Sequence, residues 1–134
     1  MEAVVLCGLQ GAGKSTLAAE QLAGHVCVSV DDLGSRDRAE ALMRACVRDG
    51  RPFVVDDVNA TAADRAPWLQ AAREAGYRVA CWWIDAPASL AVRRNRTRRF
   101  DREVPLAGIV GTRRRFEPPA PVEGWDELRR MPVA

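Results

Sequence analysis

Lysine is almost absent from this sequence of 134 residues. Lys14 is its only lysine, and every other member of its 20 basic residues is arginine. A lone lysine among arginines marks a position that needs a compact, flexible ammonium group, because a planar guanidinium is not an equivalent substitute. Histidine is equally scarce, and we expect the single His25, between a helix and a strand, to be structural or solvent-facing.

Closely spaced cysteines are also missing. The four cysteines, Cys7, Cys27, Cys46 and Cys81, form no CxxC pair, which argues against a zinc site or a disulfide framework. Cysteines within apolar runs behave as small hydrophobic residues, so we expect them to be buried thiols.

The sequence has no apolar run of about 18 residues, the length that a membrane-spanning helix requires. Met1 leads directly into an apolar segment with no charged region before it, so we expect a cytoplasmic protein with no membrane partner. The formal net charge is only +2, and such a charge by itself says little about nucleic acid.

Short apolar runs alternate with helical patterns, which predicts an α/β fold with a single domain over residues 1–134. We expect strands near 3–7, 26–30, 53–55 and 78–84, and helices near 14–23, 37–48 and 64–75. Thr61 or Asp64 can cap the third helix, and Pro67 favours the later start. Beyond the strands we expect two helices, the first within an Arg-rich lid at about 87–104, and an extended tail at about 116–134 that packs Trp125 and Leu128 onto the body.

Residues Gly8 to Ser15 match the P-loop pattern of G, four residues, G, K and S or T, after an apolar strand and before a helix. Glycines allow the tight turn, and successive backbone N–H groups then point at an anion. We therefore expect ATP and Mg²⁺, with Lys14 on the outer phosphates and Ser15 on the metal. The expected nucleotide-binding residues of the loop are Gly8, Gly11, Ala12, Gly13, Lys14, Ser15 and Thr16.

Acidic pairs follow two of the predicted strands. Phosphoryl transfer needs a carboxylate near the attacking hydroxyl group, and Asp31 is our candidate for this catalytic base. Asp56 is a candidate for orienting Ser15, the metal's water shell or the acceptor, and Asn59 for holding that loop and contacting substrate. Asp32 and Asp57 are more simply explained as turn or cap residues.

Arginines are crowded between residues 93 and 102, and Asp101 is the only acidic residue within this run. Residues 94 and 98 share a helix face, so we expect Arg98 first, and then Arg94, to bind the nucleotide and stabilise the transferring phosphoryl group. A second basic patch, residues 113–115, either helps to hold a polyanionic acceptor or offsets a helix dipole.

Taken together, these segments resemble the 5′-kinase domain of polynucleotide kinases, especially that of the animal polynucleotide kinase-phosphatases. The resemblance rests on "GLQGAGKST", "VDDLGS", "GRPFVVDDVN", "AREAG", "RRNRTRR", "VPLAGIV" and, most specifically, "RRRFEPP" followed by "EGW". It implies a P-loop kinase fold whose small parallel sheet of about four strands has the order 2-3-1-4. It also implies that Lys14 and Ser15 bind ATP and Mg²⁺, that Asp31 activates a 5′-hydroxyl group, that Asp56 contacts the acceptor region, and that Arg98 belongs to the lid.

The chain departs from that family at one position. Many members carry arginine three residues after the catalytic aspartate, where this chain has Gly34, so we expect Arg36 or Arg38 to take over the contact with the acceptor.

Three functions follow as hypotheses. The first is ATP-dependent phosphorylation of 5′-hydroxyl ends of DNA or RNA by a monomer. Since the chain has no phosphatase motif of the D-x-D-G-T kind and no ligase module, we expect it to perform only the phosphorylation step, with a separate phosphatase or ligase as a candidate partner. The second is a kinase of a small metabolite or antibiotic, and the third is a nucleotide-binding module without transfer activity.

Overall fold

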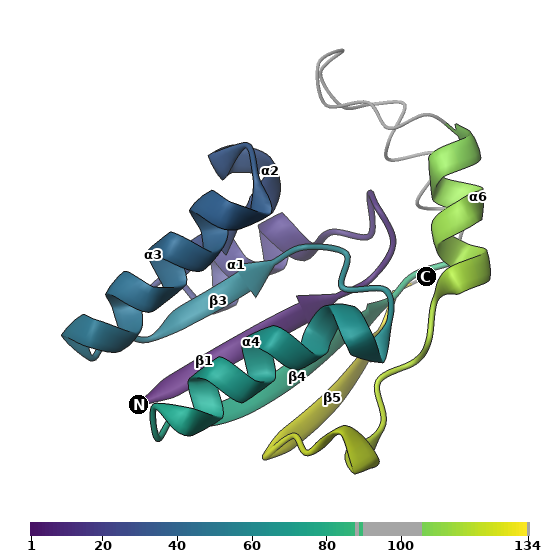
Figure 1. Ribbon diagram of the computed structural model, residues 1–134. Coiled ribbons are helices and arrows are strands. Elements are labelled where there is room, and N and C mark those ends of the chain that lie inside the picture. Colours follow the sequence, from purple (N-terminus) through teal and green to yellow (C-terminus); the bar gives the residue numbers. More distant parts are fainter. Residues whose placement is uncertain (88, 90–105, 134) are drawn as a thin grey trace.

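The computed structural model describes residues 1–87, 89 and 106–133. It is an α/β structure in which the polypeptide alternates between strands and helices (Figure 1). In chain order the elements are β1 (Glu2–Cys7), α1 (Lys14–Gln21), β2 (Val26–Ser29), α2 (Val30–Leu33), α3 (Arg36–Asp49), β3 (Phe53–Asp56), α4 (Ala62–Glu74), β4 (Arg78–Asp85), α6 (Leu106–Arg115), the 3-10 helix η2 (Pro121–Glu123) and β5 (Glu127–Pro132).

The five strands form one sheet in the order β2-β3-β1-β4-β5, and every neighbouring pair is parallel. The predicted order 2-3-1-4 is therefore confirmed, but the sheet has a fifth strand that the sequence reading assigned to an extended tail. Strand β5 has no continuous apolar run because it lies at the sheet edge, where polar side chains remain half-exposed. Polar cross-strand contacts hold it to β4, including Arg130 to Asp85 and Trp82 to Glu127.

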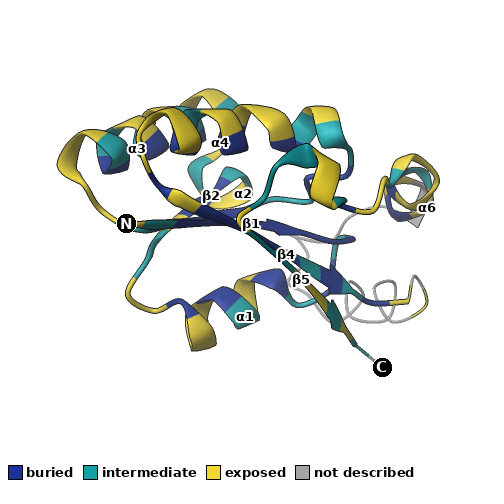
Figure 2. Cartoon of the chain, turned by 90° about the horizontal axis from the view of Figure 1, so that it is seen from below, coloured by how far each residue is buried: buried dark blue, intermediate teal, exposed yellow. Residues whose placement is uncertain are grey.

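Helices cover both faces of the sheet. Figure 2 shows α3 and α4 on one face, α1 on the other, and α6 beyond the end of the sheet. Side chains of β1 alternate between the two faces, with Val5 in the core below α3 and α4 and Val4 in the core above α1. This alternation is the geometric consequence of the two-residue period of a strand.

Helix α4 begins earlier than Pro67 suggests. Thr61 is its N-cap, and the Thr61 hydroxyl accepts from the Asp64 amide at 3.1 Å while the Asp64 carboxylate accepts from the Thr61 amide at 3.3 Å. Pro67 lies inside the helix and is exposed, so its ring faces solvent. The later start was wrong because this reciprocal cap, together with the burial of Trp68 just beyond the proline, outweighs the one hydrogen bond that proline cannot donate.

The segment after α6 is anchored by a buried ion pair. Arg65, which has no exposed surface, donates to both carboxylate oxygens of Glu123 at 2.9 and 3.1 Å and to Asn59 O at 2.8 Å. Trp125 packs against the core on the α3 and α4 face, as expected for this segment.

One expectation about cysteine is wrong. Cys7, Cys46 and Cys81 are buried free thiols, but Cys27 is exposed. It lies on β2 at the sheet edge, where its neighbours Val26 and Val28 point into the core and Cys27 points to the opposite face. Within the part of the chain that the structure describes, no helix has the length and apolar character needed to cross a membrane.

Candidate functional site

The loop between β1 and α1 has the backbone that its glycines predict. Gly8 has φ +155°, and a Cβ atom there would lie 2.7 Å from the Ile84 carbonyl oxygen of the neighbouring strand. Gly13 is the N-cap of α1 with φ +105°, in the left-handed region. The Gly8 amide donates to Val58 O at 3.0 Å and thereby ties the loop to the segment after β3. Any side chain at Gly8 would push β1 and β4 apart.

Lys14 lies at the first residue of α1 and is 8% exposed. Its ammonium group donates to Gly8 O and Leu9 O, both at 2.9 Å, so the side chain folds back over the start of the loop. These contacts hold the positive charge at the mouth of the loop, where phosphate oxygens would replace the two carbonyl groups as acceptors.

Ser15 and Asp56 meet at the start of α1. The Ser15 hydroxyl donates to Asp56 Oδ2 at 2.6 Å, and Asp56 is 8% exposed at the carboxyl end of β3. Hydroxyl and carboxylate oxygens are the ligand types that Mg²⁺ prefers, and in kinases nucleotide phosphates and water complete its octahedron. Among the described residues there is no group of three or more His, Cys, Asp or Glu side chains that could bind a metal ion.

Asp31 and Asp57 are two further carboxylates near the ends of strands, Asp31 after β2 and Asp57 after β3. Asp31 is exposed on the short helix α2, directly after β2. Burial raises the pKa of Asp57, the Val58 amide and the charges of Lys14 and Arg36 lower it, and the charge of Asp31 raises it further. Lys14, Asp31 and Arg36 thus all influence the charge of Asp57, although the four residues come from separate segments.

Asp32 differs from its neighbour Asp31. Its backbone amide donates to the Ser29 hydroxyl at 3.3 Å, so Ser29 caps α2. Asp32 is exposed in the first turn of this helix, a place where a negative charge is favourable.

Asn59 lies beneath the site. It is 2% exposed, has φ +49°, and donates from its amide to Leu6 O at 2.8 Å. These contacts join the loop after β3 to β1, so the side chain holds the loop, as the sequence suggested. Its direct contact with substrate stays a prediction, and at 2% exposure the side chain offers little surface for it.

Arg36 and Arg38 are the candidates to replace the arginine that family members carry where this chain has Gly34. The charge of Arg36 lowers the pKa of Asp57. Its guanidinium donates to Asp64 O at 3.2 Å and lies 5.1 Å from the centre of the Trp68 ring, which fixes it between α3 and α4. Arg38 donates instead to Leu33 O at 3.3 Å and is exposed. Gly34 ends α2 with φ +88°, a conformation in which an arginine would be strained.

The arginine candidates of the lid, Arg94 and Arg98, lie outside the described residues, and so does the first of the two helices expected after β4. The second is α6, whose last turn contains the exposed residues 113–115. Gln10 in the loop donates to the Thr112 hydroxyl at 3.0 Å, and Thr112 donates to Gly108 O at 2.8 Å. The loop is thus connected directly to α6.

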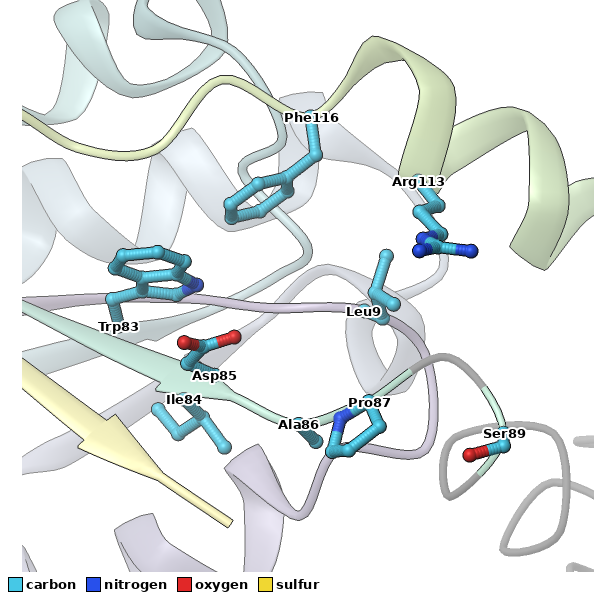
Figure 3. A pocket seen from close by; sticks show the side chains of 9 residues that line it. All are labelled: Leu9, Trp83, Ile84, Asp85, Ala86, Pro87, Ser89, Arg113 and Phe116. Atoms are coloured by element: carbon cyan, nitrogen blue, oxygen red, sulfur yellow. The ribbon is translucent and has the colours of Figure 1, made fainter. Parts of the chain in front are cut away.

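A pocket of about 430 Å³ lies between the end of β4, the P-loop and α6. Figure 3 shows Trp83 and Asp85 entering it from β4, Leu9 from the loop, and Arg113 and Phe116 from the end of α6. The Trp83 and Phe116 rings are stacked, with centroids 5.9 Å apart and an interplanar angle of 28°. The remaining lining residues are Ile84, Ala86, Pro87 and Ser89.

Sequence reasoning missed Asp57 and this pocket. A signal for Asp57 existed: a strand alternates its side chains, so the second aspartate after "FVV" faces away from Asp56 and Ser15. Trp83 is half-buried against Phe116, whereas Trp82 belongs to the core above α1. Trp83 and Phe116 are far apart in the chain, and no local sequence pattern predicts that their rings stack.

Comparison with known proteins places these features in a family. The model of the AAA domain family matches residues 4–119. The chain is 27% identical over 137 aligned positions to the bifunctional polynucleotide phosphatase/kinase of Schizosaccharomyces pombe, an alignment that covers 98% of this chain and 33% of that protein. The chain therefore spans one third of the length of this curated relative.

Solved structures share the fold. Kti12 from Chaetomium thermophilum, solved in complex with ADP-AlF3, superimposes with a TM-score of 0.72 at 20% identity, over 98% of this chain and 88% of that one. A gluconokinase from Sinorhizobium meliloti gives a TM-score of 0.64 at 19% identity, over 99% and 83% of the two chains. The chain thus belongs to the AAA domain family and has the fold of P-loop kinases.

Proposed function

We propose that this protein transfers the γ-phosphate of ATP to the 5′-hydroxyl ends of DNA or RNA. The observation that carries the proposal is the likeness to the fission yeast polynucleotide phosphatase/kinase, which extends over nearly the whole chain. The other similar proteins support the P-loop kinase fold but do not distinguish among acceptors. The structure is compatible with the proposal because Lys14 of the phosphate loop and the exposed carboxylate of Asp31 both act electrostatically on Asp57.

The P-loop binds the phosphates of the nucleotide. In this proposal the backbone amides of Gly11 to Ser15, other than that of Ala12, which donates to Leu9 O at 3.1 Å, donate to the anion. Lys14 leaves its two carbonyl acceptors to contact the outer phosphates. Ser15, oriented by Asp56, contributes its hydroxyl group to Mg²⁺, which neutralises charge on the β- and γ-phosphates when bound. In this proposal Arg98 and Arg94 add positive charge to the transferring group.

Asp31 receives the proton in the transfer step. The oxygen of the 5′-hydroxyl group attacks the γ-phosphorus, the bond from phosphorus to the bridging oxygen of ADP breaks, and ADP leaves with that electron pair. Asp31 orients the hydroxyl group and accepts its proton as the new bond forms. Asp57 and Arg36 border the acceptor, and Asn59 supports them from below.

Transfer of labelled γ-phosphate to DNA and RNA oligonucleotides with 5′-hydroxyl ends tests the proposal. We expect labelled 5′ ends with the wild-type protein, and their loss with Asp31→Asn. Asp32→Asn is the matched control, because it removes a charge from the next residue of the same helix. Oligonucleotide affinity should fall steeply with salt, and an affinity that is unchanged between low and high salt rejects the polynucleotide acceptor.

A small-molecule kinase is the second candidate, because a gluconokinase is among the solved structures that share this fold. This candidate predicts that a small hydroxylated compound such as gluconate stimulates ATP consumption while oligonucleotides are not labelled. If ATP binds and neither kind of acceptor is phosphorylated, the protein is a nucleotide-binding module.

A further inference from the structure

We infer that the pocket between β4 and α6 binds the nucleobase of the acceptor's 5′-terminal nucleotide, an inference that rests on the proposed function. The pocket adjoins the P-loop through Leu9, so a group bound there lies next to the phosphates. Its volume of about 430 Å³ falls within the range of about 300–1,000 Å³ that is typical of small-molecule sites.

The lining suits a planar, polar ring. The stacked rings of Trp83 and Phe116 form one wall and the Leu9 side chain another (Figure 3). Aromatic side chains bind nucleobases of any sequence, because every base has a π face. Arg130 lies 5.3 Å from the centre of the Trp83 ring and holds it in place from the neighbouring strand. The wall is therefore built before a ligand arrives.

Polar groups at the pocket complement a nucleotide. Two nitrogen atoms of the Arg130 guanidinium donate to Asp85, and both donate to its Oδ2 atom, at 2.6 and 2.8 Å. No hydrogen bond to Asp85 Oδ1 occurs among the described residues, so this atom can accept from an N–H group of a base. Arg113 brings a guanidinium from the exposed last turn of α6, in the position to meet the phosphate that follows the terminal nucleoside.

The position of the pocket favours the acceptor over the donor as the source of the base. Trp83 and Asp85 alternate with Trp82 and Ile84 along β4, and the latter two lie in the core above α1. Trp83 and Asp85 thus point to the face that carries α3 and α4, opposite the Ser15–Asp56 pair, while Ile84 reaches the pocket from the other face. In addition, the Glu117 amide, next to Phe116, donates to Ala60 O at 2.8 Å. This bond ties the aromatic wall to the loop that begins with Asp57.

The test compares two single-stranded DNA oligonucleotides with a 5′-hydroxyl group, one with an intact 5′-terminal nucleotide and one with an abasic residue there. For the wild-type protein we expect the KM of the abasic oligonucleotide to be about tenfold higher, the order of effect that one stacked base contributes. In Phe116→Leu and Trp83→Leu this ratio should fall towards one while the KM for ATP is unchanged. Phe116→Tyr keeps the ring and should keep the ratio.

Trp82→Leu is the matched control, because Trp82 is the adjacent residue of β4 on the opposite face. It should retain the wild-type ratio, and thermal unfolding of each variant shows that the protein is folded. A wild-type ratio near one, or a ratio that persists in both Leu variants, overturns the inference while the kinase activity stands. A raised KM for ATP with the ratio unchanged assigns the pocket to the donor's base and also overturns it. If the wild-type protein labels no 5′ end, the proposed function fails, and this inference fails with it.

Discussion

The phosphate loop and the group around Asp57 are built in opposite ways. The loop is one stretch of eight residues, Gly8 to Ser15, whose shape depends on glycine backbone angles and on the first turn of the helix that follows. The charges that act on Asp57, in the loop after β3, come from α2, the start of α3 and Lys14, and the pocket combines residues of β4 and α6 with Leu9. In the proposed reaction the loop binds the donor, and the composite region binds the acceptor.

This difference indicates which part can change its specificity. A polyphosphate is the same in every nucleoside triphosphate, so one short backbone motif suffices to bind it. An acceptor varies in size and charge, and side chains from several elements can be exchanged independently without disturbing the loop. Damage to the donor loop and damage to the acceptor region should therefore change different kinetic quantities.

The largest effect is expected at the donor loop. Lys14 is the only charged residue within the loop from Gly8 to Ser15. We expect Lys14→Met to lower the rate of phosphoryl transfer by about 10³-fold or more. Labelled-phosphate transfer measures this loss, with Arg48→Met as the control because Arg48 is exposed and paired with Asp49. Wild-type turnover in Lys14→Met contradicts the assignment of the loop.

The second-largest effect is expected at Asp31, in the acceptor region. Asp31→Asn should lower kcat by about 10²- to 10⁴-fold, the range for loss of a general base, and leave the affinity for ATP unchanged. Single-turnover transfer and nucleotide titration measure the two quantities. If Asp32→Asn has the larger effect, Asp31 is not the base.

A third effect concerns stability beneath the acceptor region. Arg65→Met leaves Glu123 as an unpaired, nearly buried carboxylate, and we expect a loss of about 3–5 kcal/mol in the free energy of unfolding. Denaturant titration measures it. Arg73→Met, which breaks a pair of exposed side chains at 3.8 Å, should cost less than about 1 kcal/mol, and equal losses in the two variants would show that burial of the pair is unimportant.

The contribution of the Arg65–Glu123 ion pair to the free energy of unfolding depends on pH. Burial alone would raise the pKa of Glu123, but hydrogen bonds from Arg65 and the Ala120 amide bring it below its ordinary value of 4.5. A carboxyl group whose pKa is lowered on folding stabilises the protein above the ordinary pKa and loses that contribution as the pH falls through the lowered one. The stability difference between wild type and Glu123→Gln should therefore narrow in acid, and a difference that is constant with pH contradicts this.

The smallest effect is expected at Asp57. Because burial raises the pKa of Asp57 above 3.8, its charge opposes folding at neutral pH. Asp57→Asn should unfold at a slightly higher temperature at neutral pH, and the gain should vanish as the pH falls through the raised pKa towards 3.8. In the same variant the KM for the acceptor should rise while the KM for ATP does not. A rise in the KM for ATP alone would place Asp57 with the donor loop.

The structure shows how far local patterns reach. Strands β1 to β4 and the P-loop were predictable because apolar runs, glycines and caps act over a few residues. Strand β5 was not, since Glu127–Pro132 owes its strand conformation to pairing with β4 and not to its own apolar content. The start of α4 was misjudged for a similar reason: Pro67 argued against a helix that the Thr61–Asp64 cap and the burial of Trp68 stabilise.

The sequence by itself determined the α/β class, the phosphate loop with its lysine, and Asp31 and Asp56 as candidate residues, because each depends on neighbours along the chain. Only the tertiary structure decided that the charges of Lys14, Asp31 and Arg36 act on Asp57, that Asn59 is buried, and that Trp83 and Phe116 wall a pocket. The physical reason is that backbone conformation is set within a few residues. The distance between side chains depends instead on the order of the strands in the sheet and on which of its faces each side chain points to.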